Sequence, residues 1–238
     1  MSEENLDSVD PRLHAAASSV VELTEGIFVE LVRLARVVAE LGVPARPALG
    51  GPRDWEAVER AVSGLLRTQP LMTGAGLAVC SPAVRPGPST PSFAWWVLRD
   101  GEVRRKQHVL NPRSDFFYDV TEARWFRVPH RTGRPALLPP YVDSWGTDDA
   151  TMTAAVPLTL GDDILGVVAA DLDVRVYLTA LEEILGAADA TAVLDDDGRV
   201  IASTRPEMEP GARLAATGLT VLTARAEVDR FGWVVVRS

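Results

Sequence analysis

The segment FFYDVTEARWF, residues Phe116–Phe126, carries the densest signal in this chain of 238 residues. Aromatic rings, a few charges and rigid prolines gather around it, whereas the rest of the chain is mostly aliphatic. Of 15 Phe, Trp and Tyr residues, 10 lie between Phe93 and Trp145. Rings with polar tips fill a core and also form the walls of small-molecule pockets. We therefore interpret this region as a ligand-sensing site.

The composition is that of an acidic globular protein. It is 47% hydrophobic and 24% charged, which predicts a packed core. The net charge of −9 argues against nucleic acid as a main partner, because phosphate binding needs a concentrated positive field. A local group of basic side chains, interpreted as a solvated hairpin face, consists of Arg99, Arg104, Arg105 and Lys106.

Neither a disulfide nor a membrane span is expected. The one cysteine, Cys80, excludes an intramolecular disulfide and a multi-cysteine metal site. Residues 1–5 do not have the basic start and apolar stretch of a signal peptide. No apolar run approaches the ~18–20 residues that cross a bilayer. The sequence thus predicts a cytoplasmic protein without a membrane partner.

Hydrophobic periodicity predicts helices at about 20–41, 54–67 and 174–185. The first helix has an apolar seam that either packs on the chain's own sheet or forms a homodimer contact: Ile27, Leu31, Leu34, Val38 and Leu41. Asp54 is the expected cap of the second helix.

Strands are expected mainly as hairpins. They pair 93–98 with 102–110 around Asp100-Gly101, 152–160 with 164–172, and 190–194 with 199–203. Strand 74–80 precedes them, and strands 220–228 and 231–236 end the chain. Because hairpins give antiparallel neighbours, the fold class is α+β, with a long N-terminal helix on a central antiparallel sheet. We expect a helical segment at 1–70, a ligand-binding module at 71–186 and a small β-rich module at 187–238.

Enzymatic and metal-binding patterns are not found. There is no Walker loop, dinucleotide fingerprint or Gly-x-Ser-x-Gly elbow. None of His14, His108 and His130 has the partner spacing of a helical zinc site. A partial calcium-loop pattern at Asp195–Gly198 fails at both end positions, so it is read as a turn. We expect no cofactor, no metal and no enzymatic activity, an enzyme around Asp143–Asp149 being the weakest alternative.

Asp171 ends the apolar run 164–170, which places its carboxylate at or near the interior. A buried carboxylate needs a basic side chain, backbone donors or a cationic ligand. It could instead cap the helix that begins near Val174, a role that Asp173 fills equally well.

Several motifs in order resemble the Cache family of PAS-like sensor domains: Tyr118-x6-Trp125-Phe126, Gly133-x-Pro135, Pro140-Tyr141-Val142-Asp143, Pro157 and Gly166-Val167-x3-Asp171. The likeness is greatest to the membrane-distal module of double-Cache chemoreceptors and sensor kinases, and it covers about residues 20–185. The tail, from Ala192 to Ala202 and from Gly232 to Val236, is similar to a reduced second module.

The resemblance implies roles for named residues. In amino-acid-binding members, Tyr118 would line the pocket, Trp125 would help to hold the ligand's carboxylate, and Tyr141 and Asp171 would receive its ammonium group. Asp143, Arg124 and Phe126 are further candidates. Either Trp95 or Trp96 would add a wall, since only one of them can face inward on a strand, and we include Trp96.

The chain departs from the family pattern where those members place an arginine that clamps the carboxylate. Ala123 occupies that position, and the adjacent Arg124 points elsewhere than Trp125. The ligand is therefore expected to be an amine, an amino acid or a related metabolite, with the signal passing through a partner such as a regulator protein. The alternative is a protein-interaction or dimerisation module with a degenerate pocket.

Overall fold

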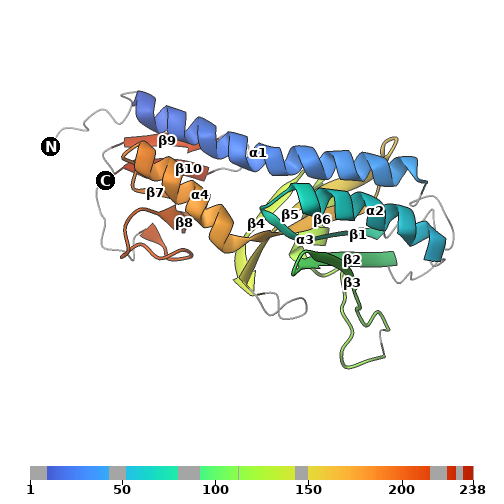
Figure 1. The fold of residues 1–238 in the computed structure, drawn as a ribbon. Helices are drawn as coiled ribbons and strands as arrows, with labels where there is room; N and C mark the ends of the chain where they lie inside the picture. The colour runs from blue at the N-terminus through green and yellow to red at the C-terminus, as the bar shows by residue number, and fades with distance from the viewer. Residues whose placement is uncertain are drawn as a thin grey trace. The chain divides into compact units, whose positions relative to one another are not determined.

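Hairpins along the chain place successive strands beside one another, and the structure has them in two antiparallel sheets (Figure 1). This computed structural model describes residues 10–42, 52–79, 92–111, 113–142, 150–214, 224–228 and 233–237. The chain divides into one unit of residues 27–173 and a second of residues 1–26 with 174–238.

The first unit contains a six-stranded sheet in the order β3-β2-β1-β6-β5-β4. Its strands are β1 (Met72–Val79), β2 (Ser92–Arg99), β3 (Glu102–Lys106), β4 (Ala136–Val142), β5 (Ala150–Leu160) and β6 (Asp163–Asp173). All neighbours are antiparallel. The predicted α+β class with a central antiparallel sheet is confirmed. The β2–β3 turn also follows the prediction, because Asp100 and Gly101 both have positive φ, 52° and 77°.

Helices lie on both faces of this sheet. Helix α2 (Pro52–Thr68) packs on β1 and β2, and helix α3 (Arg124–Thr132) packs on β4, β5 and β6. Trp96 of β2 contacts Trp55 of α2, whereas its neighbour Trp95 contacts Trp125 of α3. We call these two surfaces the α2 face and the α3 face.

The long first helix, α1 (Pro11–Glu40), begins about ten residues earlier than its periodicity predicts. Asp10 caps it, because its side chain accepts hydrogen bonds from the backbone N–H groups of Arg12 and Leu13 at 2.9 and 3.3 Å. Pro11 fits the first helical position, where a missing N–H costs nothing. The seam positions described within 27–38 are 0–4% exposed, so the chain itself covers them.

The strand β4 was not expected, since its segment contains Pro139 and Pro140. It lies at the edge of the sheet, and its pairing with β5 shifts register between Leu138 and Tyr141. Prolines are tolerated at edges and irregularities, where a missing N–H breaks no ladder. The edge position thus explains how a proline pair enters the sheet.

The second unit has the sheet β8-β7-β10-β9 and one further helix. Its elements are α4 (Val174–Ala187), β7 (Ala192–Leu194), β8 (Val200–Ser203), β9 (Ala224–Val228) and β10 (Trp233–Arg237). The buried Tyr177 of α4 shares a 2.8 Å hydrogen bond with Thr24 of α1. The two last predicted strands are confirmed only within 224–228 and 233–236, because 220–223 and 231–232 lie outside the described residues.

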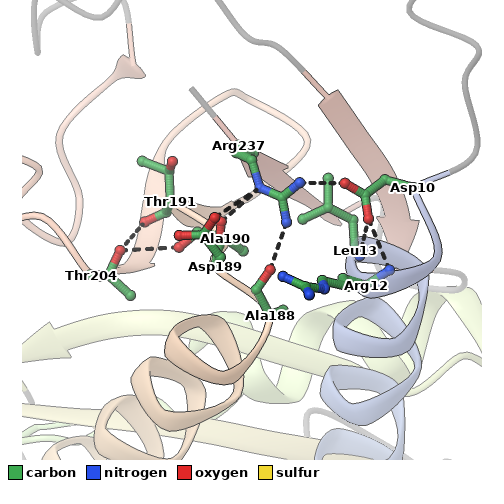
Figure 2. Close-up of polar contacts among 9 residues, drawn as sticks. All are labelled: Asp10, Arg12, Leu13, Ala188, Asp189, Ala190, Thr191, Thr204 and Arg237. Atoms are coloured by element: carbon green, nitrogen blue, oxygen red, sulfur yellow. Dashed lines mark hydrogen bonds and ion pairs between the residues drawn. The ribbon is translucent and has the colours of Figure 1, made fainter.

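Arg237 connects the start of α1 with the end of α4 inside this unit (Figure 2). Its guanidinium forms an ion pair with Asp10 and donates hydrogen bonds to the carbonyl oxygens of Ala188 and Asp189, at 2.6 and 2.7 Å. A planar guanidinium can satisfy several acceptors at once, which suits it to the end of a helix. One side chain of β10 therefore joins three segments that are distant in sequence.

Candidate functional site

The α3 face gathers most of the aromatic rings that the sequence singled out. A buried cluster there includes Phe93, Trp95, Val120, Trp125, Phe126 and Leu138, with Tyr118 and Tyr141 packed against it. The rings of Trp95 and Trp125 have centroids 5.6 Å apart, and Phe93 lies 6.1 Å from each. The structure thus brings Tyr118, Trp125 and Tyr141 together.

Asp171 lies on the same face, two residues beyond Ala169 of the cluster along β6. It is 8% exposed, which confirms the expected interior position. Thr153, its partner on β5, donates a 2.8 Å hydrogen bond to its carboxylate. Because a hydroxyl has one proton, Tyr141 donates in turn to Thr153, at 2.7 Å. The hydroxyls of Tyr141 and Thr153 thus form a chain of two hydrogen bonds that orients the Asp171 carboxylate.

The capping alternative for Asp171 does not match this geometry. Asp171 pairs with Gly74 of β1 and with Thr153 of β5, inside the ladder of β6. Helix α4 begins at Val174, so the residue before it is Asp173. The Asp171 side chain therefore lies on the α3 face and does not cap α4.

Trp125 and Tyr118 form the helical side of the cluster. Trp125 lies in the first turn of α3, and its indole N–H donates to the Tyr118 hydroxyl at 3.1 Å. Arg124 is exposed while Trp125 is 6% exposed, so the two side chains diverge as expected. Phe126 is buried beside Trp125, at a centroid distance of 6.1 Å.

Ala123 occupies a position from which a longer side chain would reach this site. It is the N-cap residue of α3, with φ −62° and ψ 132°, and it packs against the aromatic cluster. An arginine at this position would face the rings, whereas the side chain of Ala123 is a methyl group. Ala123 itself brings no positive charge to the cluster.

Trp96 does not join the other candidates, and Trp95 lies on the α3 face instead. Trp96 is fully buried on the α2 face, under the guanidinium of Arg105 at 5.7 Å from its ring. The indole of Trp95 lies across Gly74 and Gly76 of β1: Cβ atoms built at these glycines would be 2.9 Å from its Nε1 and 2.7 Å from its Cε3. The alternation of these two glycines is the sequence signal that could have identified Trp95. Asp143, another candidate, lies outside the described residues.

The basic hairpin is only partly solvated. Arg104 and Arg105 are exposed, as expected; Arg104 pairs with Glu102, and the Arg105 guanidinium lies over Trp55 and Trp96. Lys106 stands opposite Trp95 in the β2–β3 register, and its ammonium nitrogen is buried. The sequence interpretation of a solvated face is therefore wrong for Lys106, because its ammonium nitrogen is buried on the face that Trp95 occupies.

His108, two residues after Lys106, packs against two of the same rings. Its centroid is 4.7 Å from that of Phe93 and 5.4 Å from that of Tyr118. Burial, and next the positive charge of Lys106, lower the pKa of His108 to about 4. The imidazole is neutral at pH 7, so the charge at this end of the α3 face belongs to Lys106.

Within the described ranges, none of the helices is long and apolar enough to cross a membrane. Among the same residues, no cluster of three or more His, Cys, Asp or Glu side chains is placed to hold a metal ion.

No family model matches the chain, and a search of curated proteins finds no match. Among solved structures, the ligand-binding domain of the Pseudomonas aeruginosa amino acid chemoreceptor PctB, in complex with L-Arg, has a TM-score of 0.64 at 15% identity, covering 99% of this chain and 94% of that one. The sensory domain of the Campylobacter jejuni chemoreceptor Tlp3, with isoleucine bound, has a TM-score of 0.65 at 15% identity, over 99% and 93%.

A third solved structure is the ligand-binding domain of the P. aeruginosa amino acid chemoreceptor PctC, in complex with GABA. It has a TM-score of 0.60 at 14% identity, and the match covers 95% of each chain. These likenesses show the fold, which is that of chemoreceptor sensor domains. The Cache-type, PAS-like architecture expected from the sequence is confirmed.

Proposed function

We propose that this chain is a sensor domain that binds a small molecule with an ammonium group, either an amine or an amino acid, on its α3 face. The observation that carries the proposal is the buried carboxylate of Asp171, held by Thr153 beside an aromatic cluster. A carboxylate with aromatic faces nearby attracts a small organic cation. The fold supports the proposal, because its neighbours PctB, Tlp3 and PctC carry amino acids or GABA.

In this proposal Asp171 and Tyr141 receive the ammonium group, while Trp95, Trp125 and Tyr118 form the walls. Phe126 packs edge-to-face against Trp125. Asp143 stays a candidate as a second acid. The signal passes to a partner protein, and the cytoplasmic location expected from the sequence stays a prediction.

The test is a thermal-shift screen of amines and amino acids, followed by calorimetry on the best binder. Asp171→Asn keeps the shape of the side chain and removes its charge, so affinity should fall at least tenfold. Asp163→Asn is the matched control, since Asp163 is exposed at the other end of β6. Tyr141→Phe gives a second variant in case Asp171→Asn unfolds. Binding that survives both Asp171→Asn and Tyr141→Phe would reject this site.

A dimerisation module is the second candidate function, and one observation favours it. On α1, Val29, Val32 and Val37 are 46%, 44% and 39% exposed, although the predicted apolar seam is covered by the chain. Val29 and Val32, three residues apart, lie on one side of the helix and form a patch suited to a second helix. Sedimentation of the wild type against Val29→Glu/Val32→Glu tests it: a wild-type monomer eliminates this candidate.

A further inference from the structure

Lys106 presents a buried charge that the described part of the chain does not neutralise. Its ammonium nitrogen has no hydrogen-bond partner among the described residues. Burying an ammonium group is costly unless an anion or several acceptors accompany it. Such a group at the edge of a ligand-sensing face is suited to receive an anion from outside the chain.

The register places Lys106 on the α3 face. It pairs with Trp95 of β2, and side chains of directly opposed residues lie on the same side of a sheet. Its neighbour Arg105 lies on the α2 face, over Trp55 and Trp96, as alternation requires. Lys106 therefore belongs to the same face as the aromatic cluster.

Lys106, on the edge strand β3, and Asp171, on the inner strand β6, lie on this face three strands apart. The row that begins at Lys106 continues through Trp95 and Gly76 to Ala169, and Asp171 lies two residues farther along β6. Three strand spacings of about 4.8 Å and a two-residue rise place the two Cα atoms roughly 16 Å apart. The indole of Trp95 lies between them, flat over β1.

We infer that Lys106 binds the carboxylate of an extended amino acid whose ammonium group binds Asp171, an inference that rests on the proposed function. Ala123, the N-cap residue of α3, carries no charge, whereas Lys106 of β3 brings a positive charge to this face. The separation of the two charged residues favours a ligand whose amine and carboxylate are several carbon atoms apart. An ω-amino acid, with a methylene chain to lie along Trp95, has this chemistry.

The probes are four ω-amino acids with chains of three to six carbons, each paired with the alkylamine of the same length, measured by titration calorimetry. We expect wild-type protein to bind at least one ω-amino acid more tightly than its alkylamine. Lys106→Met should lower that affinity at least tenfold and leave the affinity for the alkylamine unchanged. Arg104→Met, which removes an exposed charge from the same strand, should alter neither.

A second measurement does not depend on any ligand. If Lys106 carries an uncompensated buried charge, Lys106→Met should raise the melting temperature of the free protein, whereas Lys106→Arg should not. Unchanged binding of ω-amino acids to Lys106→Met, or their failure to bind the wild type, would overturn the inference. If the wild type then still binds an amine and this binding depends on Asp171, the proposed function stands and only the role of Lys106 is rejected. If the wild type binds no amine, the proposed function and the role of Lys106 are both rejected.

Discussion

Thr153 and Asp171 face each other across β5 and β6, and the threonine hydroxyl donates a 2.8 Å hydrogen bond to the carboxylate. The Tyr141 hydroxyl reaches the same threonine from the edge strand β4. Three adjacent strands thus fix the direction of one acid. If Asp171 binds a ligand as we propose, the orientation of its carboxylate is already set, which reduces the ordering cost of binding.

Thr153→Val should destabilise the fold more than Tyr141→Phe. The valine removes a donor from a buried carboxylate, a change that costs about 1–3 kcal/mol, whereas a lost hydrogen bond at the partly exposed Tyr141 costs about 0.5–1.5 kcal/mol. Urea unfolding of both variants measures the difference. Equal losses would mean that Thr153 does not contribute to holding Asp171.

Tyr177 and Thr24 form a buried pair, and burial raises the pKa of Tyr177 to about 12. Thr24→Val leaves a buried phenol without this partner and should cost about 1–3 kcal/mol. In Tyr177→Phe, Thr24 still bonds the Val20 carbonyl at 2.7 Å, so the cost should be smaller. Once one of the two hydroxyls has been removed, removal of the other should lower the free energy of unfolding only slightly. A double-mutant cycle by chemical denaturation measures this coupling. Additive losses would contradict coupling between the two hydroxyls.

Stability should depend on His108 between pH 4 and about 6.5. The folded chain protonates this residue near pH 4, whereas the unfolded chain does so near its ordinary value of 6.5. In that window the unfolded state binds more protons, so the free energy of unfolding falls as the pH decreases. His108→Gln should flatten this part of the profile. Lys106→Met should flatten it less, because it removes only the second cause of the lowered pKa. A wild-type profile identical to that of His108→Gln would show that His108 titrates normally.

Gly76→Ala should severely destabilise the sheet. An added Cβ would meet Trp95 Cε3 at 2.7 Å and come closer still to the carbonyl oxygen of Ala94, an atom of the paired strand that cannot give way. Gly64→Ala is the control, since this glycine lies on α2 with nothing near its missing Cβ. There the alanine should add about 0.5–1 kcal/mol of stability. Melting temperatures that shift the same way in both variants would contradict this contrast.

Local patterns were sufficient for the hairpins, because turn chemistry such as Asp100-Gly101 acts over a few residues. The motif order also predicted which side chains would meet: Tyr118, Trp125 and Tyr141 lie in or against one cluster, and Asp171 lies on the same face. These features depend on short-range periodicity and on a recognisable succession of segments.

The features that the sequence did not predict depend on pairing between strands that are distant in the chain. Which of Trp95 and Trp96 faces α3 depends on the parity of β2 relative to β1, since a one-residue shift exchanges the two faces. The same parity, one strand farther out, places Lys106 on the α3 face. The strand β4 escaped prediction because its prolines are acceptable only at an edge, and edge position is a property of the finished sheet.

Because the Trp95 indole lies across Gly74 and Gly76 of β1, the structure also limits which residues can occupy these positions in related sequences. A larger residue at Gly74 would collide with the indole, and loss of the tryptophan would remove that contact. A larger residue at Gly76 would also collide with the carbonyl oxygen of Ala94, whatever side chain stands at position 95. Related sequences that lose the tryptophan should therefore vary at Gly74, whereas Gly76 should persist with or without it. A lineage that keeps the tryptophan while replacing either glycine must have moved the two strands apart.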